Sequence, residues 1–274
     1  MTDRGAEPVI RVRGLVNRFG SEVVHDGLDL DVFAGEVLGV VGGSGSGKSV
    51  LLRSIVGLNR PTEGHVEVFG TDILKASEAE RHEIERRWGV LFQDGALFSS
   101  LTVAQNIEVP IKEFYRMPQV LMDEIAALKI GLAGLPEDAG SKFPSQLSGG
   151  MRKRAGLARA LALDPEIVFL DEPTAGLDPI AAGDFDALIR DLKSSLGLTV
   201  FMVTHDLDTL FAICDRVAVL VDKKLRIGTL EQMLNDDHPW IRAYFHGPRG
   251  RAAQHAEALH IAMASNPIAA ATSA

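Results

Sequence analysis

The sequence predicts an α/β fold in which a mostly parallel sheet carries helices on both faces. The chain opens with short β-like runs separated by glycine-containing turns, at 9–15, 23–30 and 37–41. From Gly150 onward, apolar strands alternate with helical patterns, the strands at 167–170 and 199–203 and the helices at 150–163 and 181–196. Strands that are apolar along their whole length and alternate with helices indicate a parallel sheet buried on both faces.

The middle of the chain predicts a helical insertion. A helix is expected at 49–58, and two further strands at 65–69 and 89–92 flank a charged, solvated helix at 76–87. Between about Leu101 and Lys142 the β signal disappears. Residues 119–132 predict a helix with four apolar side chains on one side, Leu121, Ile125, Leu128 and Leu132.

Composition limits the classes of protein. With 274 residues, 46% hydrophobic and 24% charged, the chain is long enough for one well-buried core or two joined subdomains. A net charge of -9 argues against a protein that wraps nucleic acid through its overall field. The apolar runs are far shorter than the roughly 20 residues that span a bilayer, and Met1 to Pro8 lack a signal-peptide pattern. The lone Cys214 is interpreted as a small core residue.

A glycine-rich loop is the first motif that carries chemistry. It fits the Walker A pattern and lies between the strand at 37–41 and the helix that follows. Its glycines let successive backbone N–H groups face phosphates, and the helix N-terminus favours an anion. Lys48 is expected to reach the β- and γ-phosphates, and the Ser49 hydroxyl to bind Mg²⁺. The candidate nucleotide-binding residues here are Gly42, Gly43, Ser44, Gly45, Ser46, Gly47, Lys48 and Ser49.

Two carboxylates, Asp171 and Glu172, end the strand at 167–170. Ligands of open α/β sheets bind at the carboxyl ends of strands. Asp171 is therefore expected to hold Mg²⁺ and Glu172 to polarise the attacking water. By itself such a pair is equally typical of an exposed turn, and the phosphate loop is what favours catalysis.

The segment Leu147-Ser148-Gly149-Gly150-Met151 resembles the signature of the ABC-type ATPases. Other matches follow in family order: Phe19 at the adenine-stacking loop, Gln93 in the Q-loop, Ala175-Gly-Leu-Asp178 as the D-loop and His205 in the switch loop. Each has a simpler alternative when taken alone: Phe19 as a core residue, Gln93 as a surface amide, His205 as a structural histidine. The resemblance covers roughly residues 9–245.

The resemblance implies a P-loop NTPase fold of the ABC ATPase type. Its expected parts are a RecA-like, mostly parallel sheet, an N-terminal antiparallel β subdomain and a helical subdomain at about 99–162, all within a nucleotide-binding domain at 1–247. The implied cofactors are ATP and Mg²⁺. The implied catalytic residues are Glu172, His205 and Gln93, the implied metal-binding residues are Ser49, Gln93 and Asp171, and Phe19 stacks on the adenine.

The signature also implies a homodimer. Ser148 and the N–H groups of Gly149 and Gly150 begin a helix aimed at an anion. In the family they face the ATP of a second copy, with Asp178 at the seam between the two chains. Two ATP molecules are then enclosed head to tail.

Further matches suggest a subfamily. Gln93-Asp-Gly-Ala-Leu-Phe98 and Asp171-Glu-Pro-Thr-Ala-Gly-Leu-Asp-Pro-Ile180 resemble the ATPase subunits of Mla-type phospholipid transporters, which work with MCE proteins. Met151 departs from the family's usual glutamine. Because the phosphate contacts come from the serine hydroxyl and the backbone, ATPase activity is expected to survive.

Two other functions compete with transport. A different P-loop enzyme would leave the signature unexplained, and the guanine-reading Asn-Lys-x-Asp motif does not occur. Soluble ABC proteins of translation usually carry two cassettes and those of DNA repair a long coiled coil, and neither appears in 274 residues. The runner-up is the ATPase of another small-molecule importer, because substrate and direction of transport belong to the permease.

The implied partners are a second copy, integral membrane permease subunits, an MCE-type lipid-binding protein and a small cytosolic regulator, with no nucleic acid. The expected location is peripheral, on the cytoplasmic face of the inner (plasma) membrane. Leu97, Phe98 and Leu101 are candidate permease contacts. A helix at 238–245 either packs on its own domain or, with the tail at 248–274, holds a neighbouring subunit or the regulator.

Overall fold

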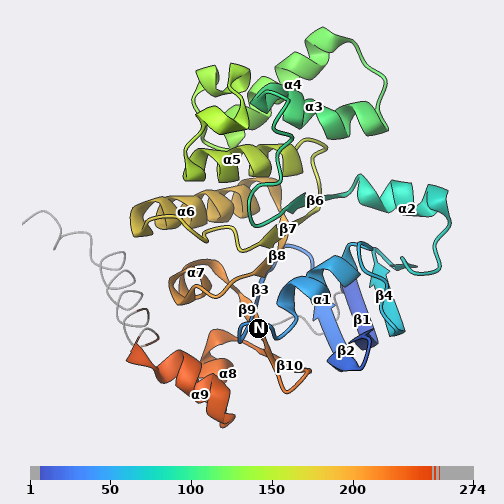
Figure 1. The fold of residues 1–274 in the computed structure, drawn as a ribbon, viewed down its shortest axis with the longest axis vertical. Coiled ribbons are helices and arrows are strands. Elements are labelled where there is room, and N and C mark those ends of the chain that lie inside the picture. The colour runs from blue at the N-terminus through green and yellow to red at the C-terminus, as the bar shows by residue number, and fades with distance from the viewer. Residues whose placement is uncertain (1–6, 249, 251–252, 254–274) are drawn as a thin grey trace, which may run out of the picture.

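The fold is built around two sheets (Figure 1). The computed structural model describes residues 7–248, 250 and 253, and in this part of the chain the sheets have the strand orders β10-β9-β3-β8-β7-β6 and β2-β1-β4-β5. The strands of the larger sheet are β3 (Val37–Gly42), β6 (Trp88–Leu91), β7 (Ile167–Asp171), β8 (Thr199–Val203), β9 (Arg216–Val221) and β10 (Lys224–Gly228). Those of the smaller are β1 (Ile10–Phe19), β2 (Glu22–Val32), β4 (Glu63–Val68) and β5 (Thr71–Asp72).

Strand directions confirm the predicted fold class. The neighbouring pairs from β9 through β3, β8 and β7 to β6 are parallel, and β10 alone in this sheet of the described chain runs antiparallel, beside β9. The smaller sheet is antiparallel throughout. The chain therefore has the mostly parallel sheet and the N-terminal antiparallel sheet that the sequence implied.

Alternating side chains on β8 separate the two faces of the larger sheet. Phe201 and Val203 join the core that lies under helix α1 and the antiparallel sheet, whereas Val200 and Met202 join the core under helix α6. Figure 1 shows α1 and α6 on opposite sides of the strands. The helices of the α/β part are α1 (Lys48–Ile55), α2 (Glu78–Glu85), α6 (Pro179–Leu196), α7 (Leu207–Ile213), α8 (Leu230–Leu234) and α9 (Pro239–His246).

Helix α7 packs closely on β3. A side chain at Gly39 would lie 2.6 Å from Leu210 Cδ2 and 2.7 Å from Cys214 Sγ, so only glycine fits there. Cys214 is partly buried between two hydrophobic clusters, which confirms it as a small packing residue. Burial raises the pKa of its thiol.

A separate group of helices stands at the top of Figure 1 and has its own hydrophobic cluster. It consists of α3 (Val103–Phe114), α4 (Gln119–Leu132), α5 (Gly149–Ala160) and the short 3₁₀ helices η1 (Glu137–Ser141) and η2 (Pro144–Gln146). The hydrophobic periodicity of the sequence did not predict helix α3. Its start carries a capping box, in which Thr102 and Gln105 bond each other's backbone N–H groups.

The buried side of α4 is not the side marked by its leucines. Leu121 and Leu128 are 44% and 60% exposed, whereas Met122, Ala126 and Ile130 pack into the helical cluster. Lys129 is also on the buried side, and its ammonium bonds Asp164 Oδ1 at 2.5 Å. Periodicity finds an apolar side but does not show which side has a neighbour, because α4 has apolar residues on adjacent sides.

Candidate functional site

The phosphate loop connects β3 to α1 and requires glycine at two positions for steric reasons. A side chain at Gly47, which has a φ of 103°, would lie 2.4 Å from Val24 Cγ1 and 2.6 Å from His25 Nε2. At Gly42 it would lie 2.6 Å from the Leu220 carbonyl oxygen. The loop is therefore pressed between β2 and β9, which fixes the direction of its backbone N–H groups.

Lys48 folds back across the loop. Its ammonium donates to the carbonyl oxygens of Gly42 at 2.9 Å and Gly43 at 3.2 Å. Burial lowers its pKa, while Glu172 and Asp171 act in the opposite direction. The ammonium of Lys48 thus lies close enough to the carboxylates of Asp171 and Glu172 for their charges to act on its pKa.

Ser49 and Asp171 lie together as expected. The Ser49 hydroxyl donates to Asp171 Oδ1 at 2.9 Å, and Asp171 is buried at the end of β7. A hydroxyl next to a carboxylate suits Mg²⁺, which takes oxygen ligands and keeps several of its waters. Among the described residues no cluster of three or more His, Cys, Asp or Glu side chains offers a different metal site. These two oxygens therefore fit the metal that the motif implies.

Glu172 and His205 form a direct contact. His205 Nδ1 lies 2.6 Å from Glu172 Oε2, across the ends of β7 and β8. An ionised carboxylate only accepts, so Nδ1 carries the hydrogen. Glu172 has a φ of 52°, which is uncommon for a residue with a side chain. The switch-loop histidine is therefore paired with the candidate base and is not a buried structural histidine.

The loop after β6 meets Glu172 through a lysine that the sequence analysis did not single out. Lys153 of α5 donates to the backbone carbonyl oxygens of Gln93 and Glu172. The side chain of Gln93 is exposed. Lys153 therefore links the backbone of Gln93 to that of Glu172, the candidate base.

A buried polar network supports the phosphate loop from below. His25, which is fully buried, contacts the Gly47 carbonyl oxygen through Nε2 at 3.1 Å and Asn17 Nδ2 through Nδ1 at 2.9 Å. Asn17 in turn bonds Ser54 and Asn59. Burial lowers the pKa of His25 to about 4, so the ring is neutral and Nε2 is the donor. No motif marks these residues in the sequence.

Helix α9 reaches the same site from the C-terminal side. The Tyr244 hydroxyl donates to the His205 carbonyl oxygen at 3.2 Å, and Trp240 stacks on Tyr244 with ring centroids 4.9 Å apart. Ile241 and Phe245 on the other side of the helix are fully buried. Packing on its own domain is thus confirmed for α9, and the side of the helix that carries Trp240 and Tyr244 faces the switch loop. The tail at 248–274 lies largely outside the described residues.

Phe19 is exposed, not a core residue. It ends β1 and is 49% exposed, and its partner strand β2 carries Val24 and His25 against the phosphate loop. An exposed ring on the hairpin that lines the loop fits the stacking role.

The signature residues lie at the exposed start of α5. Ser148 caps the helix, accepting from Met151 N at 3.2 Å, and a side chain at Gly149 would have no heavy atom within 4 Å. Asp178 similarly caps α6, accepting from the N–H groups of Ile180 and Ala181. In the described part of the chain, no hydrogen bond or ion pair connects these residues to the phosphate loop. One chain thus presents both groups of motifs without joining them.

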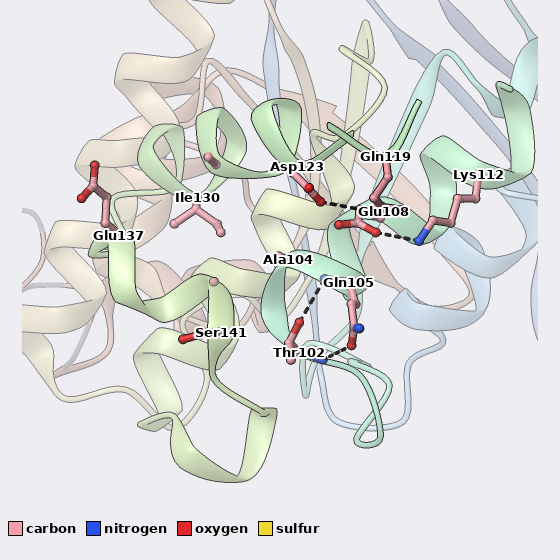
Figure 2. Close-up of a pocket in the computed structure, with 12 residues that line it drawn as sticks. Thr102, Ala104, Gln105, Glu108, Lys112, Gln119, Asp123, Ile130, Glu137 and Ser141 are labelled. Atoms are coloured by element: carbon pink, nitrogen blue, oxygen red, sulfur yellow. Dashed lines mark hydrogen bonds and ion pairs between the residues drawn. The ribbon is translucent and has the colours of Figure 1, made fainter. Parts of the chain in front are cut away.

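A hollow of about 480 Å³ lies between α3, α4 and η1. Figure 2 shows its polar side chains bonded to each other, Lys112 to Glu108 and Gln119 to Asp123. None of the candidate nucleotide residues lines it. It is separate from the site described above.

The family model of the ABC transporter matches residues 25–175, more than half of the chain. The chain belongs to the ABC transporter family. It is an ABC transporter ATP-binding subunit and an ATPase, as the motifs predicted.

Two individual relatives are also ATP-binding proteins of transport systems. The chain is 42% identical over 241 residues to the probable ribonucleotide transport ATP-binding protein Mkl of Mycobacterium leprae, covering 88% of this chain and 69% of that protein. It is 40% identical over 227 residues to the intermembrane phospholipid transport system ATP-binding protein MlaF of Haemophilus influenzae, covering 82% and 86%. A dimeric post-hydrolysis structure of the ATP-binding cassette MJ0796 with ADP and phosphate has a TM-score of 0.74 and 31% identity, covering 81% of this chain and 98% of that one.

Two kinds of residue escaped the sequence analysis. Lys153 shares a side of α5 with Gly156 and Ala160, three and seven residues on, and a lysine on a small-residue side is a signal of burial. His25 and Asn17 have no comparable signal, because their partners are distant in the sequence. Tyr244 lies in the helix predicted at 238–245, but its contact with His205 was not predicted.

Proposed function

We propose that this chain is the ATPase of an ABC system that moves phospholipid between membranes with an MCE-type protein. It drives separate permease subunits as a homodimer on the cytoplasmic face of the inner membrane. The observation that carries the phospholipid assignment is the similarity to MlaF over most of both chains. Within the described residues no helix is both long and apolar enough to span a bilayer, which fits a chain that works with a separate permease.

A groove beside the Q-loop is the proposed permease site. It has a volume of about 580 Å³ and lies between β6, α3 and α5, next to the loop that follows Gln93. Phe98 lines it with half of its surface exposed. Leu97 instead packs against the helical cluster, and Leu101 is half-buried. Of the candidate contacts, Phe98 is therefore the one on which the proposal rests, and we propose residues 99–162 as the subdomain that carries the groove's outer wall.

The proposed division of labour at the nucleotide follows from the contacts. Lys48 and the loop N–H groups hold the phosphates, and Phe19 stacks on the adenine. His205 occupies Glu172 Oε2, which leaves Oε1 to accept the proton of the attacking water. Ser49 and Asp171, with the Gln93 amide, would hold Mg²⁺, which when bound offsets charge on the phosphate oxygens.

The alternative substrate is another small molecule. It is favoured by the similarity to Mkl, a probable ribonucleotide transport ATP-binding protein. The two assignments share the nucleotide site and the groove, and they differ in what stimulates hydrolysis.

The permease site is tested by replacing Phe98 with aspartate, and Leu196→Asp is the matched control. Phe98 and Leu196 are 51% and 48% exposed, but Leu196 is at the end of α6 and does not line the groove. Phe98→Asp is expected to abolish co-purification with the permease and leave ATP binding unchanged, because it places a charge in an apolar contact. Equal recovery of the permease with both variants would contradict the groove as the contact.

The substrate is tested with the whole complex in vesicles. Fluorescent phospholipid transfer that requires ATP, together with ATPase stimulation by phospholipid, is expected. Stimulation by a ribonucleotide without lipid transfer would favour the alternative.

A further inference from the structure

Lys153 is a buried lysine at the centre of the ATPase site. It lies on α5, is 6% exposed, and shares its side of the helix with Gly156. A side chain at Gly156 would come within 2.6 Å of Leu91 and 3.1 Å of Gly95, so this side of α5 is pressed against β6 and the loop after it. The side chain of Lys153 is therefore largely shielded from solvent, and its ammonium needs partners within the protein.

Its partners are all parts of the catalytic centre. Nζ donates to the Gln93 carbonyl oxygen and, at 2.7 Å, to the Glu172 carbonyl oxygen. The carboxylates of Asp94, Glu172 and Asp171 favour its positive charge, against the effect of burial, which lowers its pKa. A lysine needed only for packing would be better replaced by an apolar residue of similar length, since burying a charge is unfavourable without compensation.

The backbone of Glu172, whose carbonyl accepts from Lys153, is in an uncommon conformation. A φ of 52° places the residue in the left-handed region, which persists when the surroundings fix it. The Glu172 N–H donates to the Val203 carbonyl at 2.8 Å, and the Glu172 carbonyl accepts from Ala175 N at 3.2 Å and from Lys153. These contacts set the direction in which the carboxylate leaves the strand, toward His205.

We propose that Lys153 is a positioning residue for ATP hydrolysis, which fixes the Glu172 backbone so that its carboxylate meets the attacking water, and which ties this backbone to that of Gln93. The inference rests on the proposed role of Glu172 as the base. Lys153 acts through Glu172 and Gln93, because its two hydrogen bonds go to their backbone carbonyl oxygens and not to the phosphate loop. It therefore affects the rate of the chemical step and not the binding of ATP.

The experiment compares two buried lysines in the full-length homodimer. Lys153→Met removes the ammonium with little change in length. Lys129→Met is the matched control, since Lys129 is 2% exposed and its ammonium bonds Asp164, which is not a candidate site residue. Steady-state turnover, KM for ATP and thermal midpoint are measured for both, with Glu172→Gln in the same assay. Lys153→Met is expected to lower kcat by about 10-fold or more with KM changed by less than about 2-fold. Lys129→Met is expected to change the thermal midpoint only.

Conservative replacement separates positioning from folding. Lys153→Gln keeps hydrogen-bond donors without the charge and is expected to recover part of the lost kcat. Wild-type kcat in Lys153→Met, with Glu172→Gln inactive, would overturn the inference while leaving the role of Glu172 intact. Wild-type kcat in Glu172→Gln would instead overturn the proposed base, and the inference with it. Loss of folding in both Lys153 variants would show a structural role and would equally overturn it.

Discussion

The two halves of the nucleotide site are built in opposite ways. The phosphate-loop half is bonded within the chain: Lys48 to the loop carbonyls, Ser49 to Asp171, and Gly47 to the buried His25. The signature half is exposed, and among the described residues Ser148 bonds only within its own helix. Beside it, Ile180 of the D-loop helix is 79% exposed. Backbone N–H groups at an exposed helix start can bind an anion that another surface brings. One chain therefore presents two half-sites, and we propose that a second copy joins them; the similar cassette MJ0796 is dimeric.

The largest effect is expected in the half that performs the chemistry. Glu172→Gln should lower turnover by about 1000-fold, because an amide cannot accept the proton of the attacking water. ATP binding and dimerisation should persist, since neither uses the carboxylate as a base. Single-turnover hydrolysis, equilibrium ATP binding and the molar mass in ATP measure the three quantities. Turnover near that of the wild type would remove Glu172 from the proposed role.

A substitution in the signature half should lower turnover, which needs the dimer, and leave ATP binding by the monomer unchanged. Ser148→Arg places a long side chain at the exposed start of α5. It is expected to lower turnover by about 100-fold, because the closed dimer would lose the hydrogen-bond donors that this helix start brings to the phosphate. ATP binding by the monomer should be unchanged, and Ser145→Arg, at an exposed site three residues earlier, is the charge control. Met151→Gln, which restores the family residue, should change turnover by less than about 2-fold. Weakened ATP binding by the Ser148 monomer would contradict the division into halves.

The smallest effect on turnover is expected from a substitution in the polar network beneath the phosphate loop. Such a substitution should instead alter how the free energy of unfolding depends on pH. The pKa of His25 is lowered to about 4 from 6.5, so the unfolded chain binds the proton more readily than the folded one. The contribution of His25 is complete above pH 6.5 and decreases as the pH falls toward 4. Between pH 7 and 4 the free energy of unfolding should fall by about 3 kcal/mol more in the wild type than in His25→Gln.

Denaturant unfolding at both pH values measures this difference. Burial raises the pKa of Asp186 to about 7, which acts in the opposite direction over much of this range, but it acts equally in both proteins and cancels. Parallel pH profiles for the wild type and His25→Gln would show that His25 titrates normally.

The fold was predictable where apolar runs are long. β7 and β8 are buried along their whole length, and their residues match the predicted strands to within one position. The side of α4 that packs was not predictable, because hydrophobicity marks both its exposed leucines and its buried Met122. Helix α3 was missed because Pro110 and the polar residues Asn106 and Glu108 at its buried positions weaken the period, although its capping box was present in the sequence.

The site was predictable where function is carried by short motifs. Ser49 and Asp171 were both assigned to Mg²⁺, and Glu172 and His205 to the same nucleotide site; each pair is hydrogen-bonded in the structure. Lys153, His25 and Tyr244 were not foreseen, because each acts on a backbone carbonyl of a motif residue and the sequence does not record which carbonyl a side chain will reach.

Helix α9 gives the protein its own optical reporter. The sequence contains two tryptophans. Trp88 packs edge-on against Phe169 in the core. Trp240 stacks on Tyr244, and its indole nitrogen would lie 3.8 Å from a Cβ atom placed on Gly43 of the phosphate loop. The fluorescence of Trp240 therefore reports on the edge of the phosphate loop. A protein carrying Trp88→Phe would report nucleotide arrival as a change in ultraviolet emission, without any attached dye.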